Sequence, residues 1–419
     1  LSKGVKIVDI HAFERYSSLR TFVAPEGIVE IGYYAFACCS SMITFDVPKS
    51  LRRIRGWAFE NCSALKSIVV FEKVETIEFA AFKFCSKLES VELREGVKKI
   101  EAEAFAGCCS LKTIALPTSL KEIGGNAFRG CLALESIKLP EGIDCVQNET
   151  FANCSALKSV DLPYGVRYLG ADAFSGCKSL TSITLPESLE GIMEGALSYC
   201  SALTSISLPK GATYIGRNAL YGCSSLTSIY LPEHVEGIDA CAFLRCDSLT
   251  TIDVAKDNPY FTSIDGVLCS KDGKELVAWP DGKGEKVCVV PDGIEVIGEN
   301  AFYGRVSLKS VVLPATLKTI KSGAFYNCAS LESVVLPEGT QAIKSSAFCN
   351  CSSLQSLVLP KSVVEIKRSA FDDCDSLPKD VVDQIEEIVE RTEVKNEQYF
   401  PSTGRTTDDS ADECEDVPF

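Results

Sequence analysis

The sequence is poor in the residues on which most catalytic and metal sites depend. It contains only 2 histidines among 419 residues, and neither His11 nor His234 stands near a nucleophile motif. Ser-His or Cys-His catalysis is therefore not expected. A Gly-rich phosphate loop and C-x-x-C pairs at partner spacing are missing as well, which argues against nucleotide and zinc sites. These absences predict a non-catalytic protein without a cofactor or a metal.

Basic clusters and long apolar runs are also missing. No stretch approaches the roughly 18 to 20 apolar residues of a membrane-spanning helix, so no membrane span is expected. A protein that binds nucleic acid needs clustered Lys and Arg to displace counterions, but no such cluster occurs and the formal net charge is −15. Residues 379–419 carry thirteen acidic and four basic side chains, a net −9, which leaves −6 for residues 1–378. Nucleic acid is not an expected partner.

What the sequence does contain is a period of 23 residues. A pair resembling Ala-Phe recurs at this interval, always with an aliphatic residue five positions before its second member. A cysteine follows three positions after the second member in thirteen of fifteen cases, with Tyr16 and Arg305 as the exceptions. Such a period predicts a solenoid, in which each repeat buries its apolar residues only against its neighbours. The second members are Phe13, Phe36, Phe59, Phe82, Phe105, Phe128, Phe151, Phe174, Leu197, Leu220, Phe243, Phe302, Phe325, Phe348 and Phe371.

One repeat, residues 180–200, shows how the pattern builds structure. Leu180, Ile183 and Leu185 have the Leu-x-x-Leu-x-Leu spacing of a leucine-rich repeat, and the alternation at its end predicts a short β-strand. Pro186 ends that strand because proline cannot donate a hydrogen bond to a neighbouring strand. Strands of successive repeats are then expected to stack in parallel, about 4.8 Å apart. The rest of the repeat is expected to return as an arc that points these residues inward: Leu189, Ile192, Ala196, Leu197 and Cys200.

The repeat resembles those of the BspA-like class of leucine-rich-repeat proteins. The run from Leu313 to Cys328, Leu-Pro-Ala-Thr-Leu-Lys-Thr-Ile-Lys-Ser-Gly-Ala-Phe-Tyr-Asn-Cys, is a good match, and the resemblance covers about residues 5–377. We therefore expect a repeat solenoid shaped as a right-handed curved rod, with a parallel β-sheet on its concave face. Many members of the class look like surface or secreted adhesins that contact host proteins or neighbouring cells. The resemblance thus implies a protein partner.

The gap of 59 residues between Phe243 and Phe302 interrupts the period by one repeat plus 36 residues. Two apolar runs, residues 267–269 and 276–279, flank an Asp-Gly turn and predict a β-hairpin insertion within residues 255–290. Two interpretations remain open. The insertion is either a decorated repeat that extends the stack, or a projecting loop on which Tyr260, Phe261 and Trp279 anchor a ligand.

The pattern changes again after Cys374. Residues 1–377 are expected to form a solenoid of about 15 repeats, followed by a capping helix over residues 378–397. In that helix Val381, Ile385 and Val389 fall on one face, which would cover the open end of the stack. Residues 398–419 are polar and acidic and are predicted to form a disordered tail.

The 21 cysteines suggest disulfides at first sight, but thirteen of them occupy one position of the repeat. Neighbouring side chains at that position would run parallel, whereas a disulfide needs Cβ atoms about 3.5 to 4.5 Å apart with converging bonds. We therefore expect these cysteines to be buried thiols of the core. Abundant reduced cysteine favours a reducing compartment, while the family resemblance favours the cell surface.

The outward positions of the predicted strands, namely the second, third and fifth, carry the candidate binding residues. The third position is Ser or Thr in all fourteen strands and is interpreted as a strand-packing feature. The other two positions vary, as expected where specificity is set, and exposed apolar patches tend to mark interaction sites. The candidates on this face are a polar strip of Thr181, Thr184, Thr204, Ser207, Thr227, Tyr230, Thr250 and Asp253, and an apolar stripe of Val312, Val335 and Val358.

Two hypotheses about function follow. The first is a monomeric, adhesin-like surface or secreted protein that binds another protein through its concave sheet and the hairpin. The second is a cytoplasmic interaction scaffold that uses the concave face and recruits a basic partner through its acidic tail.

Overall fold

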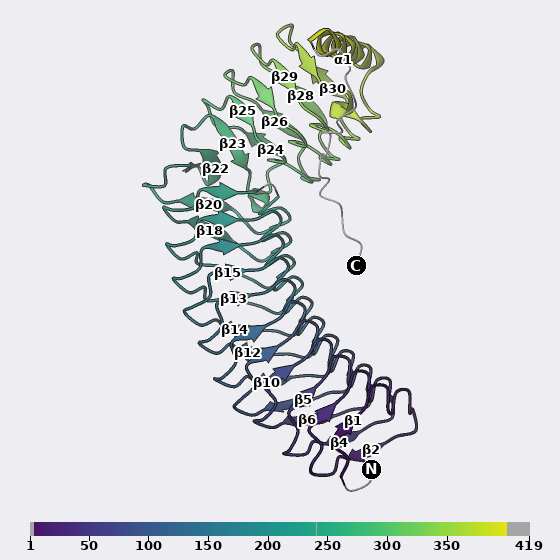
Figure 1. Cartoon of the computed structure of the whole chain (residues 1–419). Helices are drawn as coiled ribbons and strands as arrows, with labels where there is room; N and C mark the ends of the chain where they lie inside the picture. Colours follow the sequence, from purple (N-terminus) through teal and green to yellow (C-terminus); the bar gives the residue numbers. More distant parts are fainter. Residues whose placement is uncertain (1–3, 240, 400–419) are drawn as a thin grey trace. The chain divides into compact units, whose positions relative to one another are not determined.

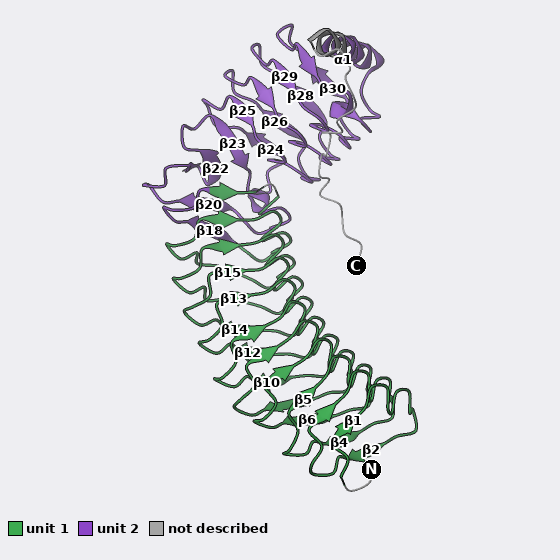
Figure 2. Ribbon diagram, viewed as in Figure 1, with its two compact units in different colours: residues 1–226, 237–242 green, residues 227–236, 243–419 purple. Residues whose placement is uncertain are grey.

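The computed structural model describes residues 4–239 and 241–399. Apart from the insertion after Phe243 and the helix at Lys379–Tyr399, this part of the chain winds into successive coils (Figure 1) of 23 residues each. The chain divides into two compact units, which Figure 2 distinguishes by colour. Unit 1 comprises residues 1–226 and 237–242, and unit 2 comprises residues 227–236 and 243–419. Both units are β-solenoids of parallel strands. The fold predicted from the repeat is therefore confirmed.

Most coils contribute a longer strand at the Leu-x-x-Leu-x-Leu segment, and paired strands run in parallel with a register of one repeat. Ile68 of one strand, for example, lies opposite Val91 of the next. An isolated bridge between Thr184 and Ser207 continues the series in unit 1. The long strands of unit 1 are β2 (Thr21–Val23), β4 (Thr44–Asp46), β6 (Ser67–Val70), β8 (Ser90–Leu93), β10 (Thr113–Ala115), β12 (Ser136–Lys138) and β14 (Ser159–Asp161). Those of unit 2 are β18 (Ser228–Leu231), β20 (Thr251–Val254), β24 (Val287–Val289), β26 (Ser310–Val312), β28 (Ser333–Val335) and β30 (Ser356–Val358).

A second series of parallel strands, each mostly two residues long, forms another side of the coil. The sequence pattern predicted only a returning arc here, because two residues are too few to show an alternation. In unit 1 this series is β1 (Ile7–Val8), β3 (Glu30–Ile31), β5 (Arg53–Ile54), β7 (Thr76–Ile77), β9 (Lys99–Ile100), β11 (Glu122–Ile123), β13 (Cys145–Val146), β15 (Tyr168–Leu169), β16 (Gly191–Ile192), β17 (Tyr214–Ile215) and β19 (Gly237–Ile238). In unit 2 it is β23 (Glu275–Ala278), β25 (Val296–Ile297), β27 (Thr319–Ile320), β29 (Ala342–Ile343) and β31 (Glu365–Ile366).

The third side of the coil is a turn around the repeated phenylalanine, whose ring stacks on its equivalents in the neighbouring coils. The rings of Phe59 and Phe82, for example, have centroids 5.2 Å apart and are tilted by 3°. Two positions per turn, two residues before and two after the phenylalanine, adopt left-handed backbone angles. Asn126 (φ 58°) and Gly130 (φ 70°) flank Phe128 in this way. Asn and Gly recur there because they tolerate this conformation better than most residues.

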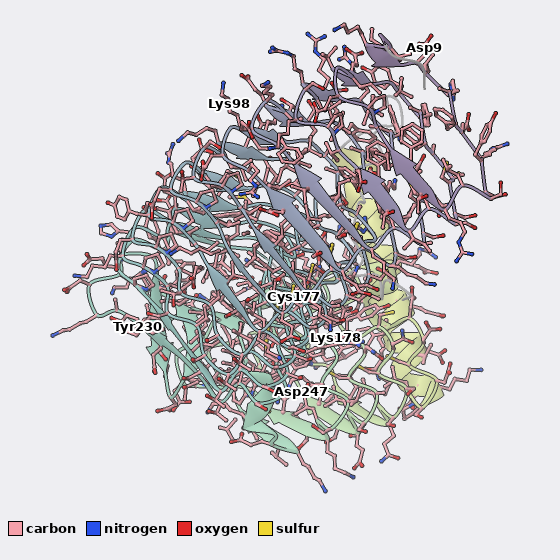
Figure 3. The ribbon with its side chains drawn as sticks, turned by 90° about the horizontal axis from the view of Figure 1, so that it is seen from below. Asp9, Lys98, Cys177, Lys178, Tyr230 and Asp247 are labelled. Carbon is pink, nitrogen blue, oxygen red and sulfur yellow. The ribbon has the colours of Figure 1, made fainter. Side chains whose placement is uncertain are left out.

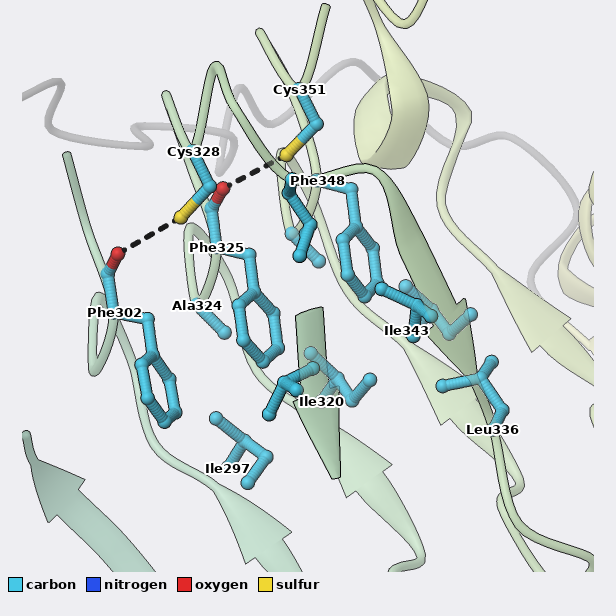
Figure 4. Packing of buried hydrophobic residues seen from close by; sticks show 14 of the residues in the cluster. Ile297, Phe302, Ile320, Ala324, Phe325, Cys328, Leu336, Ile343, Phe348 and Cys351 are labelled. Carbon is cyan, nitrogen blue, oxygen red and sulfur yellow. Dashed lines mark hydrogen bonds between the residues drawn. The ribbon is translucent and has the colours of Figure 1, made fainter. Parts of the chain in front are cut away.

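The repeated cysteines are buried thiols, as predicted, and they also act as hydrogen-bond donors. The Sγ atom of Cys328 donates to the carbonyl oxygen of Phe302 at 3.1 Å, and Cys351 repeats the bond to Phe325 at 3.2 Å (Figure 4). In unit 1, Cys177 lies inside the coil and bonds to Phe151 in the same way (Figure 3). Burial raises the pKa of such thiols; that of Cys154 reaches about 12. At neutral pH the thiols are therefore protonated, as donation requires.

The insertion contains the predicted hairpin, formed by β22 (Val267–Ser270) and β23 around Asp272-Gly273. A further strand, β21 (Phe261–Ile264), makes a second hairpin with β22 around Asp265-Gly266, which the sequence analysis missed. Asp265 and Gly266 both have positive φ angles, 51° and 77°, as a tight two-residue turn requires. Strand β23 then pairs in parallel with β25 and returns the chain to the regular stack.

Trp279 corrects the interpretation of the insertion as a loop with three exposed aromatic residues. Its side chain is only 6% exposed, and its ring centroid lies 5.2 Å from that of Phe302. Trp279 stands 23 residues before Phe302, so it occupies the position of the repeated phenylalanine in its coil. The prediction that Trp279 anchors a ligand is therefore wrong, because its ring extends the core stack.

The carboxyl-terminal end of unit 2 is covered by α1 (Lys379–Tyr399), which follows a single 3-10 turn, η2 (Arg368–Phe371). Val381, Ile385 and Val389 are buried and belong to the hydrophobic core of this unit, which confirms the predicted apolar face of the helix. The helix packs on β31. The predicted acidic tail falls almost wholly on residues 400–419, outside the residues described here. No helix in the described part of the chain is both long and apolar enough to cross a membrane.

Candidate functional site

The outward surface of the long strands, called here the long-strand face, carries an apolar row in unit 2. In β26 and β28 the fourth-position residues Val311 and Val334 are buried, while the fifth-position residues Val312 and Val335 are exposed. Because side chains alternate along a strand, the same position is exposed in each successive coil. The members of this valine row are between 52% and 61% exposed: Val289, Val312, Val335 and Val358.

Val289 was missed by the sequence analysis. Strand β24 follows the insertion directly, and its coil has Val287 at the third strand position, where the fourteen strands recognised from the sequence have Ser or Thr. The signal that could have found it is the 23-residue spacing from Val312 back to Val289. With Val289 the predicted stripe grows from three to four members, on adjacent strands of one sheet with the order β24-β26-β28-β30.

Polar groups border the valine row. At the second strand position Lys309 forms an ion pair with Glu332, with an N–O distance of 2.5 Å. At the third position Ser310 and Ser333 lie opposite each other. An apolar centre about 20 Å long between polar margins is the usual anatomy of a protein-binding surface. The arrangement can therefore bury apolar area against a partner, and the hydroxyl and charged groups can fix its register.

The predicted polar strip is divided between the two units. Thr181, Thr184, Thr204 and Ser207 are exposed on unit 1, whereas Thr227, Tyr230, Thr250 and Asp253 are exposed on unit 2. Several of its hydroxyl groups bond within their own unit. Thr204 Oγ1 donates to the carbonyl of Thr181 at 3.4 Å, and Thr250 Oγ1 donates to that of Thr227 at 3.2 Å. The hydroxyl groups of Thr204 and Thr250 thus support strand packing.

Tyr230 (Figure 3) is the exposed aromatic residue of this strip. It lies opposite Asp253 in the pairing of β18 with β20. A second exposed aromatic residue, Tyr260, stands where the insertion begins, and its hydroxyl lies 3.3 Å from Glu236 Oε2. Phe261 next to it is half-buried in β21. Of the three aromatic residues predicted for the insertion, only Tyr260 is well exposed.

Asn258, which the sequence analysis did not single out, fixes the start of the insertion. It is fully buried, and its Nδ2 atom donates to the carbonyls of Pro232 and Val235, both at 2.9 Å. Its Oδ1 atom accepts the amides of Tyr260 and Phe261, both at 2.8 Å. All four bonds join segments of unit 2, so the orientation of Tyr260 is set by a buried amide.

The short-strand side of unit 1 is charged rather than apolar. Arg55 donates to Glu30 and to Glu78, with both N–O distances 3.0 Å. The hydrogen bond from Arg55 holds the pKa of Glu30 below its ordinary value. Such ion pairs link neighbouring coils, and their charged groups are already neutralised by one another. In the described part of the chain, no group of three or more His, Cys, Asp and Glu side chains is placed to hold a metal ion.

Comparison with known proteins identifies the family. The sequence matches the BspA type Leucine rich repeat region over residues 1–108, 75–177, 146–264 and 285–392, so the chain belongs to this family. Among solved structures, it is similar to a leucine-rich repeat protein from Bacteroides ovatus, with 27% sequence identity, a TM-score of 0.53, and coverage of 93% of this chain and 86% of that one. No curated protein is significantly similar in sequence.

Two further solved structures are similar over long stretches. One is a leucine-rich cell surface protein from Faecalibacterium prausnitzii, with 28% identity, a TM-score of 0.44, and coverage of 75% of this chain and 78% of that one. The other is the pneumococcal vaccine antigen PcpA, with 20% identity, a TM-score of 0.43, and coverage of 90% of this chain and 77% of that one.

Proposed function

We propose that the chain is a non-catalytic, adhesin-like protein that binds another protein through the long-strand face of unit 2. The observation that carries this proposal is the valine row, four exposed apolar side chains at one position of four successive strands. Burying such side chains is favourable by about 25 cal/mol for each Å² removed from water. Scattered exposed valines would be ordinary, but a contiguous row is the kind of patch that marks an interaction site.

Tyr230 and Asp253 extend the proposed surface on the same unit, with Tyr260 beyond them. Tyrosine is frequent at binding sites because it combines apolar area with a polar tip. The hydroxyl groups of Thr227 and Thr250, on the same unit, form a polar surround in this proposal.

Photo-cross-linking tests which face meets the partner. A benzophenone side chain is placed at Val335 in one variant and at Ser207, the same strand position in unit 1, in a matched control. After irradiation on intact source or neighbouring cells, the Val335 variant is expected to yield one defined adduct that excess unlabelled chain abolishes. Adducts of equal yield from both variants, or from Ser207 alone, would remove the valine row from the proposal.

A location at the cell surface or outside the cell is part of the same proposal, and family membership supports it. It is tested by labelling intact and permeabilised source cells with an antibody against the chain. Labelling of intact cells is the expected result.

The second candidate function is that of a cytoplasmic interaction scaffold, and the many buried thiols in the described part of the chain favour it. In this case labelling requires permeabilised cells. Deleting residues 398–419 would then abolish a salt-sensitive interaction with a basic partner, because exposed charges act over about 10 Å at ordinary ionic strength.

A further inference from the structure

The series of long strands in unit 2 is interrupted in front of β24. In the regular coils that follow, the amide at the third strand position donates to the preceding strand. Ser310 donates to the carbonyl of Lys286 at 3.1 Å, and Ser356 donates to that of Glu332 at 3.2 Å. Val287 occupies this position in β24, and among the described residues its amide has no such acceptor. Strand β24 pairs only with β26 in this part of the chain.

The preceding long strand, β20, does not close this edge because the insertion bonds to it instead. The amide of Ile252 in β20 donates to the carbonyl of Gly266, in the turn between β21 and β22, at 2.9 Å. The coils remain in contact just before β20, where the amide of Gly282 donates to the carbonyl of Leu249 at 2.7 Å. The parallel series therefore stops at β20 and resumes at β24, and β24 begins a separate sheet.

The alternation of backbone groups along β24 determines which amide and carbonyl groups lie at its open edge. In a parallel pair, successive residues of a strand direct their amide and carbonyl groups to opposite sides. Lys286 and Val290 face β26, since Lys286 accepts from Ser310 and Val290 donates to Val312 at 3.0 Å. The amide and carbonyl groups of Val287 and Val289 consequently face the open side. The side chains of both residues are about half exposed or more. An exposed apolar edge of this kind is a template for strand pairing.

We propose that β24 accepts an extended segment of a partner protein as an added parallel strand, an inference that rests on the proposed function of the long-strand face. Strand addition supplies the missing acceptors for Val287 and Val289, and alternate side chains of the added strand provide specificity. A second copy of the chain does not fit, because its own strands are held within coils. The edge of β24 lies within a stack, so only an extended segment can reach it.

The charge of Lys286 and the side chain of Val289 indicate which residues an added strand should carry. Lys286 is exposed and has no ion-pair partner in the described ranges. At the same strand position in unit 1, Lys158 pairs with Glu135 of the preceding strand, with an N–O distance of 2.9 Å. By the same geometry, an added strand needs an acidic residue beside Lys286 and a β-branched residue three positions later, beside Val289. Strand β28 itself has this pattern, from Glu332 to Val335.

The probe is therefore a fluorescein-labelled, end-blocked peptide with the sequence of residues 329–338, Ala-Ser-Leu-Glu-Ser-Val-Val-Leu-Pro-Glu. Its binding to the full chain is measured by fluorescence anisotropy, and amide hydrogen exchange is followed at β24. We expect saturable binding with new protection of the amides of Val287 and Val289. Val289→Pro removes one outward amide and spares the bonds to β26, so affinity should fall about tenfold, while Val289→Thr should keep it.

A charge exchange provides the second, fold-neutral test. Lys286→Glu should weaken binding of the Glu332 peptide several-fold, and a peptide with Glu332→Lys should bind this variant better than the unchanged protein. No binding at about 1 mM peptide, binding without protection at β24, or equal affinity for Val289→Pro would overturn the inference. If Val312→Glu abolishes the cross-linked adduct but β24 variants do not, strand addition fails and the proposed function stands. If the β24 variants abolish the adduct but Val312→Glu does not, strand addition is supported, and the other members of the valine row are not part of the binding site.

Discussion

The long-strand faces of unit 1 and unit 2 are built on one repeat but differ at the fifth strand position. Unit 1 is mixed there, with charged residues such as Glu92, Lys138 and Asp161 as well as an exposed Val23, whereas the last four long strands of unit 2 all expose valine. The fourth position is mostly buried and aliphatic in both units, as Ile137 and Val311 show. Because side chains of a strand alternate between two sides, the exposed residues can vary while the buried residues of the core stay the same. Binding chemistry can therefore change along the solenoid without any change to the core.

This separation predicts that equivalent core substitutions have the same effect in both units. Phe105→Ala in unit 1 and Phe325→Ala in unit 2 each remove a fully buried ring from the stack. Each should lower the free energy of unfolding by about 3 to 5 kcal/mol, measured by urea denaturation. The exposed control, Val312→Ala, should change it by less than about 0.5 kcal/mol. A loss confined to one unit would show that the two stacks are not equivalent.

One coil of unit 2 has no cysteine at the repeated position. The substitution proposed there should lower the free energy of unfolding slightly less than the Phe→Ala substitutions. Arg305 replaces the repeated cysteine and lies 3.2 Å from Asp281 Oδ1, with a further bond to the carbonyl of Pro280 at 3.0 Å. Arg305→Met leaves the carboxylate without the positive charge that opposes it and should cost about 3 kcal/mol at neutral pH. Adding Asp281→Asn should recover part of this loss. Equal stability of the single and double variants would contradict the account.

The pH dependence of that loss has a defined sign. Burial raises the pKa of Asp281 to about 6, against the opposing effect of Arg305. An acid with a raised pKa in the folded state binds its proton more tightly there than when unfolded, so its contribution to stability grows as the pH falls through about 6. The cost of Arg305→Met should therefore shrink between pH 7 and pH 5, when denaturation is repeated across this range.

The thiol bonds should contribute less, and again equally in the two units. Cys131→Ala and Cys351→Ala each remove a donor to a phenylalanine carbonyl, at 3.3 Å and 3.2 Å. Each should cost about 1 to 2 kcal/mol, from the lost bond and a small cavity. Denaturation under reducing conditions measures this cost. A loss as large as that of Phe105→Ala would mean that the thiol, rather than the ring, dominates the turn.

The smallest effects are expected for the exposed ion pairs between coils. Lys158→Ala in unit 1 and Lys309→Ala in unit 2 break pairs in which both side chains remain well hydrated. Solvent screens such pairs, so neither variant should shift the midpoint of thermal unfolding measurably. A clear shift for one unit alone would show that its surface charges support the fold, and would weaken the separation of stack and surface.

The sequence alone predicts the solenoid because each repeat carries the same inward residues at the same spacing. Pro186 marks a strand end, and the outward valines follow from alternation. The second series of strands escaped prediction because a pair such as Tyr168 and Leu169 is too short to show a period. Its existence depends on pairing between coils, which a single repeat does not encode.

The insertion shows a different limit. Trp279 satisfies the 23-residue spacing to Phe302, but an aromatic residue near an Asp-Gly turn favoured an exposed position. Burial of its ring depends on the returning strand β23, which becomes evident only when β22 and β23 are placed. The open edge of β24 is likewise a property of pairing: Val287 and Val289 look ordinary until the preceding strand is found bonded elsewhere.

The most direct test of the central claim compares the same change on the two faces. Val312→Glu/Val335→Glu alters the valine row, and Thr184→Glu/Ser207→Glu alters the same strand position in adjacent coils of unit 1. Affinity for the partner identified by cross-linking is measured for both double variants, after their unfolding midpoints have been shown to match the unchanged protein. The account predicts a Kd at least about tenfold weaker for the first and unchanged for the second. Equal affinities, or a loss confined to the unit 1 variant, would contradict it.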